Sequence, residues 1–313
     1  MEYIIVRHTN FLCLAVPIAL ISAPSLADDF TINSAATSTN DGNTLDGSDT
    51  LTVTGSGSIT NTGGKAILAT GDGNTITVNG SLSTSGGQGY QAIVSSGANN
   101  TTVVGGTITT SDKTGFGINH TGANNTITVS GSIETAGESA HAIYNLVGSS
   151  NTVTLSGSII TTGSGYGIVN QSDNNTTTVT GSIVVGSTVG ALYAIGANNT
   201  ATISGSLKAA SGGYALRTAT GPNSFTLQEG ALLVGRISAV SGDATLNIDV
   251  GRDTSYIYTT EGTWTVNDLD GRSFTYSGNV ASSLSGGNSE TADEMLFDST
   301  RSCLLYTSDA ADE

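Results

Sequence analysis

The sequence predicts an all-β protein built as a stacked parallel solenoid, and three observations lead to this. Units that open on variants of Asn-Thr-Ile-Thr-Val-x-Gly-Ser-Ile recur every 24 to 26 residues between Asp49 and Ser224. The 313-residue chain is rich in Gly, with 42 residues, and holds only 3 Pro and 11% charged residues. Apolar residues alternate with Thr rather than recurring at helical spacing. A fixed period of this size is typical of a solenoid, in which each coil packs only on its neighbours.

Each unit contains three short apolar stretches, which predict three strands per coil. In Thr75-Ile76-Thr77-Val78 the apolar side chains point one way and the two Thr the other, as in a half-buried strand. The first inward column is predicted to be Leu51/Val53, Ile76/Val78, Thr102/Val104, Ile127/Val129, Val153/Leu155, Thr177/Val179, Ala201/Ile203 and Phe225/Leu227. The second column is Ile59, Leu82, Ile108, Ile133, Ile159, Ile183, Leu207 and Leu232, and the third is Ile67, Ile93, Ile118, Ile143, Ile168, Leu192 and Leu216.

These columns predict a triangular, parallel β-helix with about 25 residues per coil over residues 28–242. Differences in unit length fall in Gly-rich stretches between the second and third columns, where a corner tolerates them. Recurring Asn residues mark another corner, and we expect their side-chain amides to bond from coil to coil and to cap turn backbone. These residues are Asn74, Asn100, Asn125, Asn151, Asn175, Asn199 and Asn223.

Residues 1–27 are predicted to be a signal peptide. Arg7 supplies a positive start, Phe11 to Ile21 is an apolar stretch too short to span a bilayer, and Ser25-Leu26-Ala27 offers small residues for cleavage after Ala27. An inner-membrane anchor is the alternative. We therefore expect the mature chain to be exported.

The last eleven residues, 303–313, resemble the translation of a transposon-end adapter used in sequencing libraries. The resemblance implies that native sequence stops near Ser302, whereas a genuine acidic tail is the alternative. Because Cys13 lies in the expected signal peptide and Cys303 in this tail, the mature native part is expected to hold no cysteine. Its stability then depends on backbone ladders and burial rather than on disulfides.

The repeated Gly-Ser-Ile, the Gly-Tyr-Gly-Ile at 165–168, the export signal and the tail at 288–298 resemble the passenger region of bacterial autotransporters. The resemblance implies a right-handed β-helix carried to the surface of a Gram-negative cell, and either kept there or released. It also implies a linker, starting at 288–302, to an outer-membrane β-barrel that this sequence lacks.

Residues 243–287 differ from the repeats and concentrate five aromatic residues: Tyr256, Tyr258, Trp264, Phe274 and Tyr276. This segment resembles the stable C-terminal part of a passenger, which templates the coils behind it. A simple cap over the last coil is the alternative, because every solenoid needs one.

Catalysis, cofactors and metals are not expected. His120 and His141 fall in successive coils without an evident Ser or Asp partner, and the carboxylates of the repeats are isolated from one another. The run Asp41, Asn43, Asp46 and Asp49 does not have the spacing of a calcium loop and fits turn chemistry. The alternative from another class is a β-helix glycan-processing enzyme, which would need a carboxylate cluster made by folding.

Two surface columns are candidates for binding. Outward Thr residues form a flat array that resembles ice-binding β-solenoids, although Thr is also common on exposed strands. The array contains Thr75, Thr77, Thr126, Thr128, Thr152, Thr154, Thr176 and Thr178, together with Thr50, Thr52, Thr200 and Thr202, and is interrupted at Thr101/Val103.

The second column holds Phe116, His141, Tyr166 and Tyr214, two residues before the third apolar column. Strict alternation predicts a buried or corner aromatic stack here. The residues between would form an outward strip of Ala92, Gly117, Ala142, Gly167, Ala191 and Ala215. If the alternation is reversed, the aromatic residues are exposed and suit adhesion to sugars or surfaces.

The net charge of −16 argues against partners such as nucleic acid or anionic membranes. We therefore expect a surface-exposed or secreted passenger that is structural or adhesin-like and has no chemistry of its own. Its expected partners are its own barrel and glycans or proteins on host or neighbouring cells.

Overall fold

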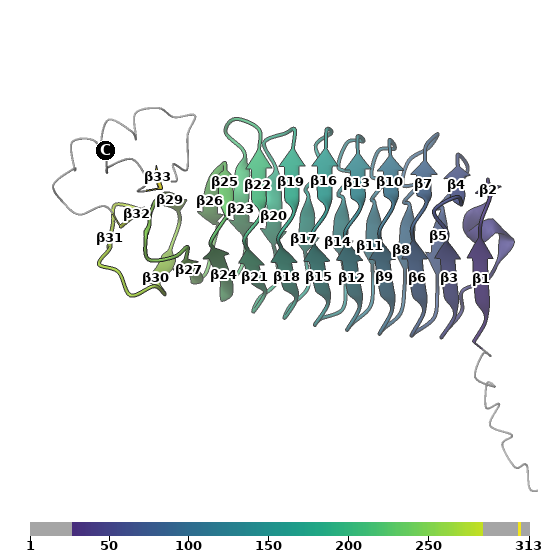
Figure 1. The fold of residues 1–313 in the computed structure, drawn as a ribbon, viewed down its shortest axis with the longest axis horizontal. Helices are drawn as coiled ribbons and strands as arrows, with labels where there is room; N and C mark the ends of the chain where they lie inside the picture. The colour runs from purple at the N-terminus through teal and green to yellow at the C-terminus, as the bar shows by residue number, and fades with distance from the viewer. Residues whose placement is uncertain (1–26, 284–305, 308–313) are drawn as a thin grey trace, which may run out of the picture.

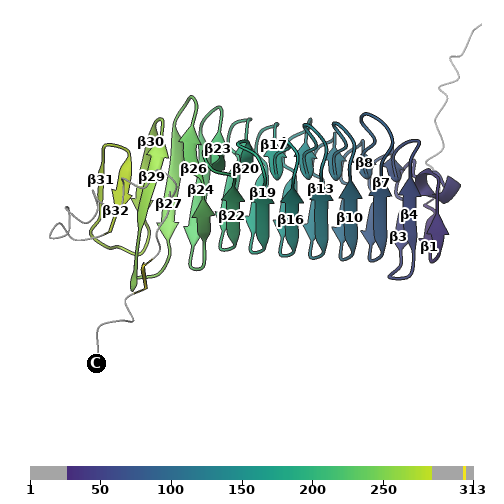
Figure 2. The ribbon, with the colours of Figure 1, turned by 90° about the horizontal axis from the view of Figure 1, so that it is seen from above.

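Three parallel sheets run along a common axis and make the chain a β-solenoid (Figures 1 and 2). The structure is a computed structural model that describes residues 27–283 and 306–307. The solenoid has about ten turns of roughly 24 residues, with three strands per turn. The predicted all-β fold with three strands per coil is confirmed.

We name the sheets by their order within a coil. Sheet A contains β1 (Asp29–Ile32), β3 (Thr50–Val53), β6 (Thr75–Val78), β9 (Thr101–Val104), β12 (Thr126–Val129), β15 (Thr152–Leu155), β18 (Thr176–Val179), β21 (Thr200–Ile203), β24 (Asn223–Gln228), β27 (Ala244–Asp249) and β30 (Trp264–Asp268). Sheet B contains β2 (Ala35–Ala36), β4 (Ser58–Asn61), β7 (Ser81–Thr84), β10 (Thr107–Thr110), β13 (Ser132–Thr135), β16 (Ser158–Thr161), β19 (Ser182–Val185), β22 (Ser206–Ala209) and β25 (Leu232–Val234).

Sheet C completes each coil. Its parallel part contains β5 (Ile67–Ala69), β8 (Ile93–Ser95), β11 (Ile118–His120), β14 (Ile143–Asn145), β17 (Ile168–Asn170), β20 (Gly190–Ala194), β23 (Tyr214–Thr218), β26 (Arg236–Ala239) and β29 (Ile257–Glu261). A short 3₁₀ segment, η1 (Thr39–Gly42), stands between β2 and β3. Paired strands align residue for residue, as with Ile76 opposite Thr102 and Ile127 opposite Val153.

The three predicted apolar columns form the core, with one correction at the end of the second. Leu51, Ile59 and Ile67, the first members of the columns, are completely buried. Leu232, however, is 45% exposed, and Leu233 pairs with Leu207 and is buried in its place. The turn before β25 is longer than those of the six preceding coils: Leu233 follows Leu227 by six residues, whereas Leu207 follows Ile203 by four, so the inward position falls one residue beyond the predicted one.

Glycine is required at the corner between sheets A and B because the coils approach closely there. A Cβ added to Gly131 would lie 1.9 Å from the carbonyl oxygen of Gly106, and the same conflict recurs at Gly157 with the oxygen of Gly131. Contacts this short are impossible for any other residue type. The Gly of the repeated Gly-Ser pair is therefore a condition of coil stacking.

The recurring Asn residues form a ladder at the corner between sheets C and A and cap turn backbone groups as predicted, but their side-chain amides do not bond to each other. The backbone N–H of Asn100 donates to Oδ1 of Asn125 at 2.7 Å, and the Nδ2 of Asn125 donates to the carbonyl oxygen of Gly122 at 2.7 Å. The amides thus bond to backbone groups rather than to each other. The same backbone-to-Oδ1 bond joins Asn74, Asn100, Asn125, Asn151, Asn175, Asn199 and Asn223 in sequence.

Asp49 begins this ladder. Its hydrogen bonds account for the presence of this member of the run Asp41, Asn43, Asp46 and Asp49 without a metal ion. Its backbone N–H donates to Oδ1 of Asn74 at 3.0 Å. Its own carboxylate accepts hydrogen bonds from the N–H groups of Asp28, Asp46 and Gly47 at 2.9, 2.7 and 3.1 Å. Burial raises the pKa of this carboxyl, but the three backbone donors outweigh it, and the pKa is lowered overall.

The core also contains a polar column on the inward side of sheet C. Ser95, His120, Asn145 and Asn170 occupy equivalent positions in four consecutive coils and are buried. Nδ2 of Asn145 donates to Oδ1 of Asn170 at 2.8 Å, and Nδ2 of Asn170 donates to Oγ1 of Thr177 at 2.9 Å. The Oγ1 of Thr102 lies 3.1 Å from Nε2 of His120.

The C-terminal end of the rod departs from the parallel pattern. β29 pairs antiparallel with β32 (Val280–Ser282), which pairs antiparallel with β31 (Thr275–Ser277). β28 (Thr254–Ser255) pairs antiparallel with β33 (Tyr306–Thr307). Arg272, whose side chain is 14% exposed, bridges Asp268 and Asp270 at 3.1 and 2.9 Å. Sheet A continues into this region through β27 and β30, so the segment is joined to the last coils.

Several sequence expectations fall outside the described residues. These are the signal peptide except its last residue, the start of the linker at 288–302, and the adapter-like tail except residues 306–307. The described part of the chain holds no helix with the length and apolarity needed to cross a membrane.

Candidate binding surface on sheet C

The outer face of sheet C carries the predicted aromatic column, and the expected alternation is reversed there. Ala92, Ala142, Ala191 and Ala215 are fully buried in the core, whereas Phe116, His141, Tyr166 and Tyr214 are partly exposed. The strip of small residues therefore points inward, and the orientation predicted for the aromatic column, on the same face as the third apolar column, is wrong. The aromatic side chains face outward instead.

Backbone geometry explains the reversal. In an ordinary strand, consecutive N–H groups point to opposite neighbours. At the entry to sheet C, however, Gly117 and Ile118 both donate to the next coil, at 3.0 and 2.9 Å, and Ala142 and Ile143 repeat this at 3.0 and 3.0 Å. The chain bends at each pair, so two consecutive side chains face the core. The inward and outward positions before the bend are therefore shifted by one residue relative to those after it, which places the aromatic side chains outside.

The outward rings form a continuous series, which we call the aromatic ladder. Phe116 and His141 stack with centroids 5.0 Å apart and an interplanar angle of 5°. Tyr144 meets both rings edge-on, at 5.0 and 5.1 Å. His141 meets Tyr166 at 5.4 Å, and Tyr166 stacks on Tyr193 at 4.9 Å. The ladder thus crosses β11, β14, β17 and β20 and the turns that lead into them.

Two arginines continue the ladder toward the C-terminal end. The guanidinium carbon of Arg217 lies 5.1 Å from the centroid of Tyr193 and 4.8 Å from that of Tyr214. The guanidinium of Arg236 lies 4.0 Å from the centroid of Tyr214 on the ladder's last rung. Tyr214 therefore joins the predicted residues through a cation–π contact rather than through direct stacking.

Sequence reasoning missed Tyr144, Tyr193 and Arg217, although a signal for them exists. Each stands three residues after the position that its coil contributes to the predicted column, which is His141 for Tyr144, Tyr214 for Arg217 and, in the coil between Tyr166 and Tyr214, Gly190 for Tyr193. Gly190 leaves room for the Tyr166 ring, since an added Cβ would lie 3.2 Å from it. Comparing the residues three positions after the predicted column in each coil would have identified these additional members of the surface.

Burial keeps most of the ladder uncharged. It lowers the pKa of His141 to about 4, so this imidazole is neutral at neutral pH, and its Nδ1 accepts the N–H of Tyr166 at 3.0 Å. Burial raises the pKa of Tyr144. It also raises the pKa of Tyr166, against the opposing effect of Arg217. The positive charge of the surface therefore comes from its two arginines.

The Thr array lies on another side of the rod, on the outer face of sheet A. Its members are in register, with Thr75 opposite Thr101 and Thr126 opposite Thr152. Thr77, Thr128, Thr154 and Thr178 are partly exposed and form the second row, which Val103 interrupts. Thr176 and Thr200 are exposed, and their Oγ1 atoms lie 3.3 Å apart. The outward orientation predicted for the array is confirmed.

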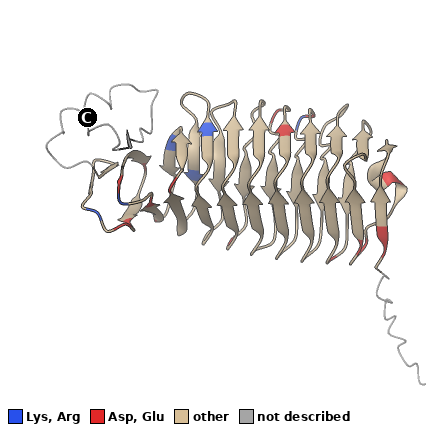
Figure 3. Ribbon diagram, in the orientation of Figure 1, with Lys and Arg blue, Asp and Glu red and all other residues tan. Residues whose placement is uncertain are grey.

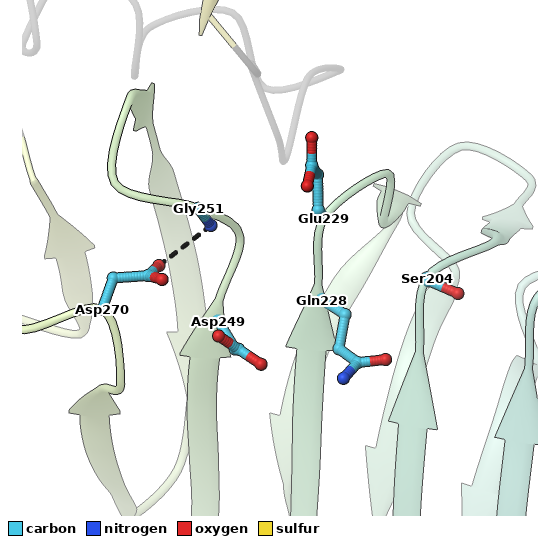
Figure 4. A pocket seen from close by; sticks show the side chains of 6 residues that line it. All are labelled: Ser204, Gln228, Glu229, Asp249, Gly251 and Asp270. Carbon is cyan, nitrogen blue, oxygen red and sulfur yellow. Dashed lines mark hydrogen bonds between the residues drawn. The ribbon is translucent and has the colours of Figure 1, made fainter.

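Carboxylates gather in a pocket near the C-terminal end of sheet A (Figure 4). The pocket has a volume of about 320 Å³ and is lined by Ser204, Gln228, Glu229, Asp249, Gly251 and Asp270. In Figure 4 the carboxylate of Glu229 points away from those of Asp249 and Asp270. Asp270 already accepts the N–H of Gly251 at 3.0 Å and pairs with Arg272. This is the feature that a glycan-processing enzyme would have to use.

The two described histidines lie on opposite faces of sheet C. His120 points into the core and His141 points outward, and neither contacts a carboxylate in the described part of the chain. Within residues 27–283 no group of three or more His, Cys, Asp or Glu side chains could hold a metal ion.

These features define the chain as a three-sheet parallel β-solenoid with an aromatic face, a Thr face and few charges along its middle coils (Figure 3). Comparison of the sequence with protein-family models and with curated proteins, and comparison with solved structures, finds no match.

Proposed function

We propose that the chain is an exported, non-catalytic autotransporter passenger that acts as an adhesive module, with the outer face of sheet C as its contact surface. The observation that supports the adhesive role is the aromatic ladder. Partly exposed rings continue from coil to coil on a rod whose other outward positions are mostly Thr, Ser and Asn. Aromatic side chains provide large, rigid contact area with a polar tip, which suits recognition of sugars and protein surfaces.

Packing explains why such a surface can be presented without destabilising the rod. The inward positions of the same strands are filled by Ile118, Ile143, Ile168 and Leu192, which belong to the core. The rings stand on the opposite face of the strands and are held by each other and by Arg217. They are therefore preorganised, which lowers the entropic cost of binding.

The adhesive role can be tested by removing two rings that are not needed by the core. We expect the purified chain to bind features of a glycan array or the surface of cells. The double variant Tyr144→Ser/Tyr193→Ser should reduce this binding at least tenfold. The matched control Thr128→Ser/Thr178→Ser alters the outer face of sheet A and should bind like the wild type. Equal binding by both variants, at unchanged urea midpoints, would contradict the proposed surface.

The export route is tested separately from binding. Independent sequencing of the locus should show an open frame that continues past Ser302 and encodes a β-barrel of amphipathic strands. If the same eleven residues 303–313 and a stop codon appear in an independent clone, the autotransporter proposal is wrong, whatever the chain binds.

The Thr array supports a second candidate, ice binding. Two Thr positions per strand face outward, about 7 Å apart along the strand, and repeat at about 4.8 Å from coil to coil. A flat, regular hydroxyl and methyl array of this kind can match a crystal lattice. Thermal hysteresis of the purified rod, lost in Thr128→Tyr, would support this role, and none at millimolar protein would exclude it.

A further inference from the structure

We infer that the arginine end of the aromatic ladder binds the carboxylate of an acidic sugar whose ring, or whose neighbour's ring, stacks on the tyrosines. The inference rests on the proposed adhesive surface of sheet C and names the chemical class of its ligand. The binding position is centred on Arg217, between Tyr193 and Tyr214.

Arg217 is held in a defined orientation but keeps donor capacity. Its guanidinium lies against two Tyr rings, and its Nη1 donates to the hydroxyl of Tyr166 at 3.2 Å. An arginine has five N–H donors. Its Nε is buried and out of reach of a ligand, but both N–H groups of Nη2 and the second N–H of Nη1 have no protein partner within the described residues. A carboxylate with two oxygens in one plane complements such a fork.

Arg217 also differs from Arg236 and Arg272 in its charge environment. Arg236 pairs with Glu261 at 3.2 Å, and Arg272 bridges two aspartates. Arg217 has no ion pair within residues 27–283. A cation that is oriented, partly exposed and not neutralised complements an anionic group at contact distance, where it outweighs the screened repulsion from the net charge of −16.

The neighbouring outward positions favour a sugar over other anions. Tyr193, Tyr166 and Tyr144 continue from Arg217 along successive coils, which are about 4.8 Å apart. This spacing is comparable to the length of one sugar residue in an extended glycan. One sugar can therefore place its carboxylate at Arg217 while the next sugar residues lie over the tyrosines. Nucleic acid and anionic membranes need many cations rather than one or two. We therefore assign the site to a carboxylated glycan.

The experiment compares acidic oligosaccharides with their own methyl esters. The full chain is titrated calorimetrically with glucuronate, galacturonate, mannuronate and sialate oligosaccharides and with the matching esters, at low and physiological salt. At least one acid should bind, and its ester should bind at least tenfold more weakly. Arg217→Gln should lower the affinity for the acid at least tenfold and abolish the preference for the acid over its ester.

Lys208 provides the matched control, because it lies in the same coil but on the exposed outer side of sheet B. Lys208→Gln removes the same charge and should leave acid binding unchanged. Arg217→Lys keeps the charge, and its urea midpoint shows whether loss of packing alone explains a defect. If Arg217→Lys binds the acid like the wild type, the planar fork is not what recognises the ligand and the inference is wrong.

The outcomes separate this inference from the proposed function. Equal affinities for acid and ester, with loss of both in Tyr144→Ser/Tyr193→Ser, would overturn the acidic ligand and leave the adhesive surface standing. Equal loss of acid binding in Arg217→Gln and Lys208→Gln would indicate a diffuse charge effect and also overturn it. Absence of binding to every acidic and neutral glycan and to cells would remove both proposals.

Discussion

Oγ1 of Thr102 lies 3.1 Å from Nε2 of His120 inside the solenoid, where both residues are fully buried. Nδ1 of His120 has no hydrogen-bond partner within the described residues. Burial lowers the pKa of this imidazole to about 4, from an ordinary 6.5. The folded rod therefore keeps His120 neutral over a range of pH in which the unfolded chain protonates it.

The first prediction concerns the pH dependence that results. Because the pKa of His120 is lower in the folded than in the unfolded chain, the contribution of neutral His120 to stability is fully present above about pH 6.5. It declines as the pH falls toward 4. His120→Asn introduces the residue that the next two coils use, Asn145 and Asn170, and it cannot titrate. When the pH is lowered from 7.5 to 4.5, the unfolding free energy of the variant minus that of the wild type should rise by on the order of 2–3 kcal/mol. Urea denaturation at both pH values measures this, and parallel pH profiles would contradict it.

The second prediction concerns the acidic start of the Asn ladder. In Asp49→Asn the new NH₂ would face the N–H groups of Asp46 and Gly47, which now donate to the carboxylate. We expect a loss of about 1–3 kcal/mol at pH 7. The lowered pKa of Asp49 means that the contribution of its carboxylate to stability is present at neutral pH and is lost in acid. The difference in unfolding free energy between wild type and variant should therefore shrink once the pH falls below the ordinary pKa of a carboxyl group. Asp46→Asn, which alters an exposed side chain of the same turn, is the control and should change stability little at either pH.

The third prediction concerns a regular member of the ladder. Asn125→Ala removes the acceptor of the Asn100 N–H and the donor to the Gly122 carbonyl, and both groups lie at a buried corner. Unfolding free energy should fall by about 2–4 kcal/mol, because two backbone groups lose their partners. The partly exposed neighbour Thr126 serves as control, and Thr126→Ala should stay within about 0.5 kcal/mol. A loss no larger than that of the control would show that water satisfies the ladder groups.

The fourth prediction concerns the A–B corner. In Gly131→Ala the added Cβ would lie 1.9 Å from the carbonyl oxygen of Gly106, so the coils must separate locally. We expect a loss of about 2–3 kcal/mol in unfolding free energy, measured with urea. Gly55→Ala is the matched control, because no atom lies within 4 Å of its added Cβ. Similar midpoints for the two variants would mean that the corner is more yielding than its geometry suggests.

The fold was predictable because one pattern repeats with little change. Alternation in Thr75-Ile76-Thr77-Val78 and its equivalents identifies inward positions, and stacking identical units leaves one register. Leu232 was misplaced because the turn before it is two residues longer than in the six preceding coils, a length that only the first complete coil, from Val53 to Ile59, shares. The amide-to-amide bonds expected of the Asn column were wrong because the corner offers unpaired backbone groups, which are nearer partners.

The candidate surface was only half predictable. The column of Phe116, His141, Tyr166 and Tyr214 is visible in the sequence, but its orientation depends on the bend at Gly117 and Ile118, where two consecutive N–H groups point the same way. Alternation alone carries no sign of that bend. Arg217 escaped notice because its partners, Tyr193 and Tyr166, are supplied by the two preceding coils.

The Asn ladder makes the two ends of the rod unlike. Each Oδ1 accepts an N–H from the coil before it, as Asn125 does from Asn100 and Asn100 does from Asn74. Removing the coil that follows an Asn would therefore leave a buried backbone N–H without its acceptor, whereas removing the coil before it would leave only a side-chain oxygen without its donor. The two ends of the rod thus expose different chemistry, and a cap over the C-terminal end has a donor to satisfy where a cap over the N-terminal end has an acceptor.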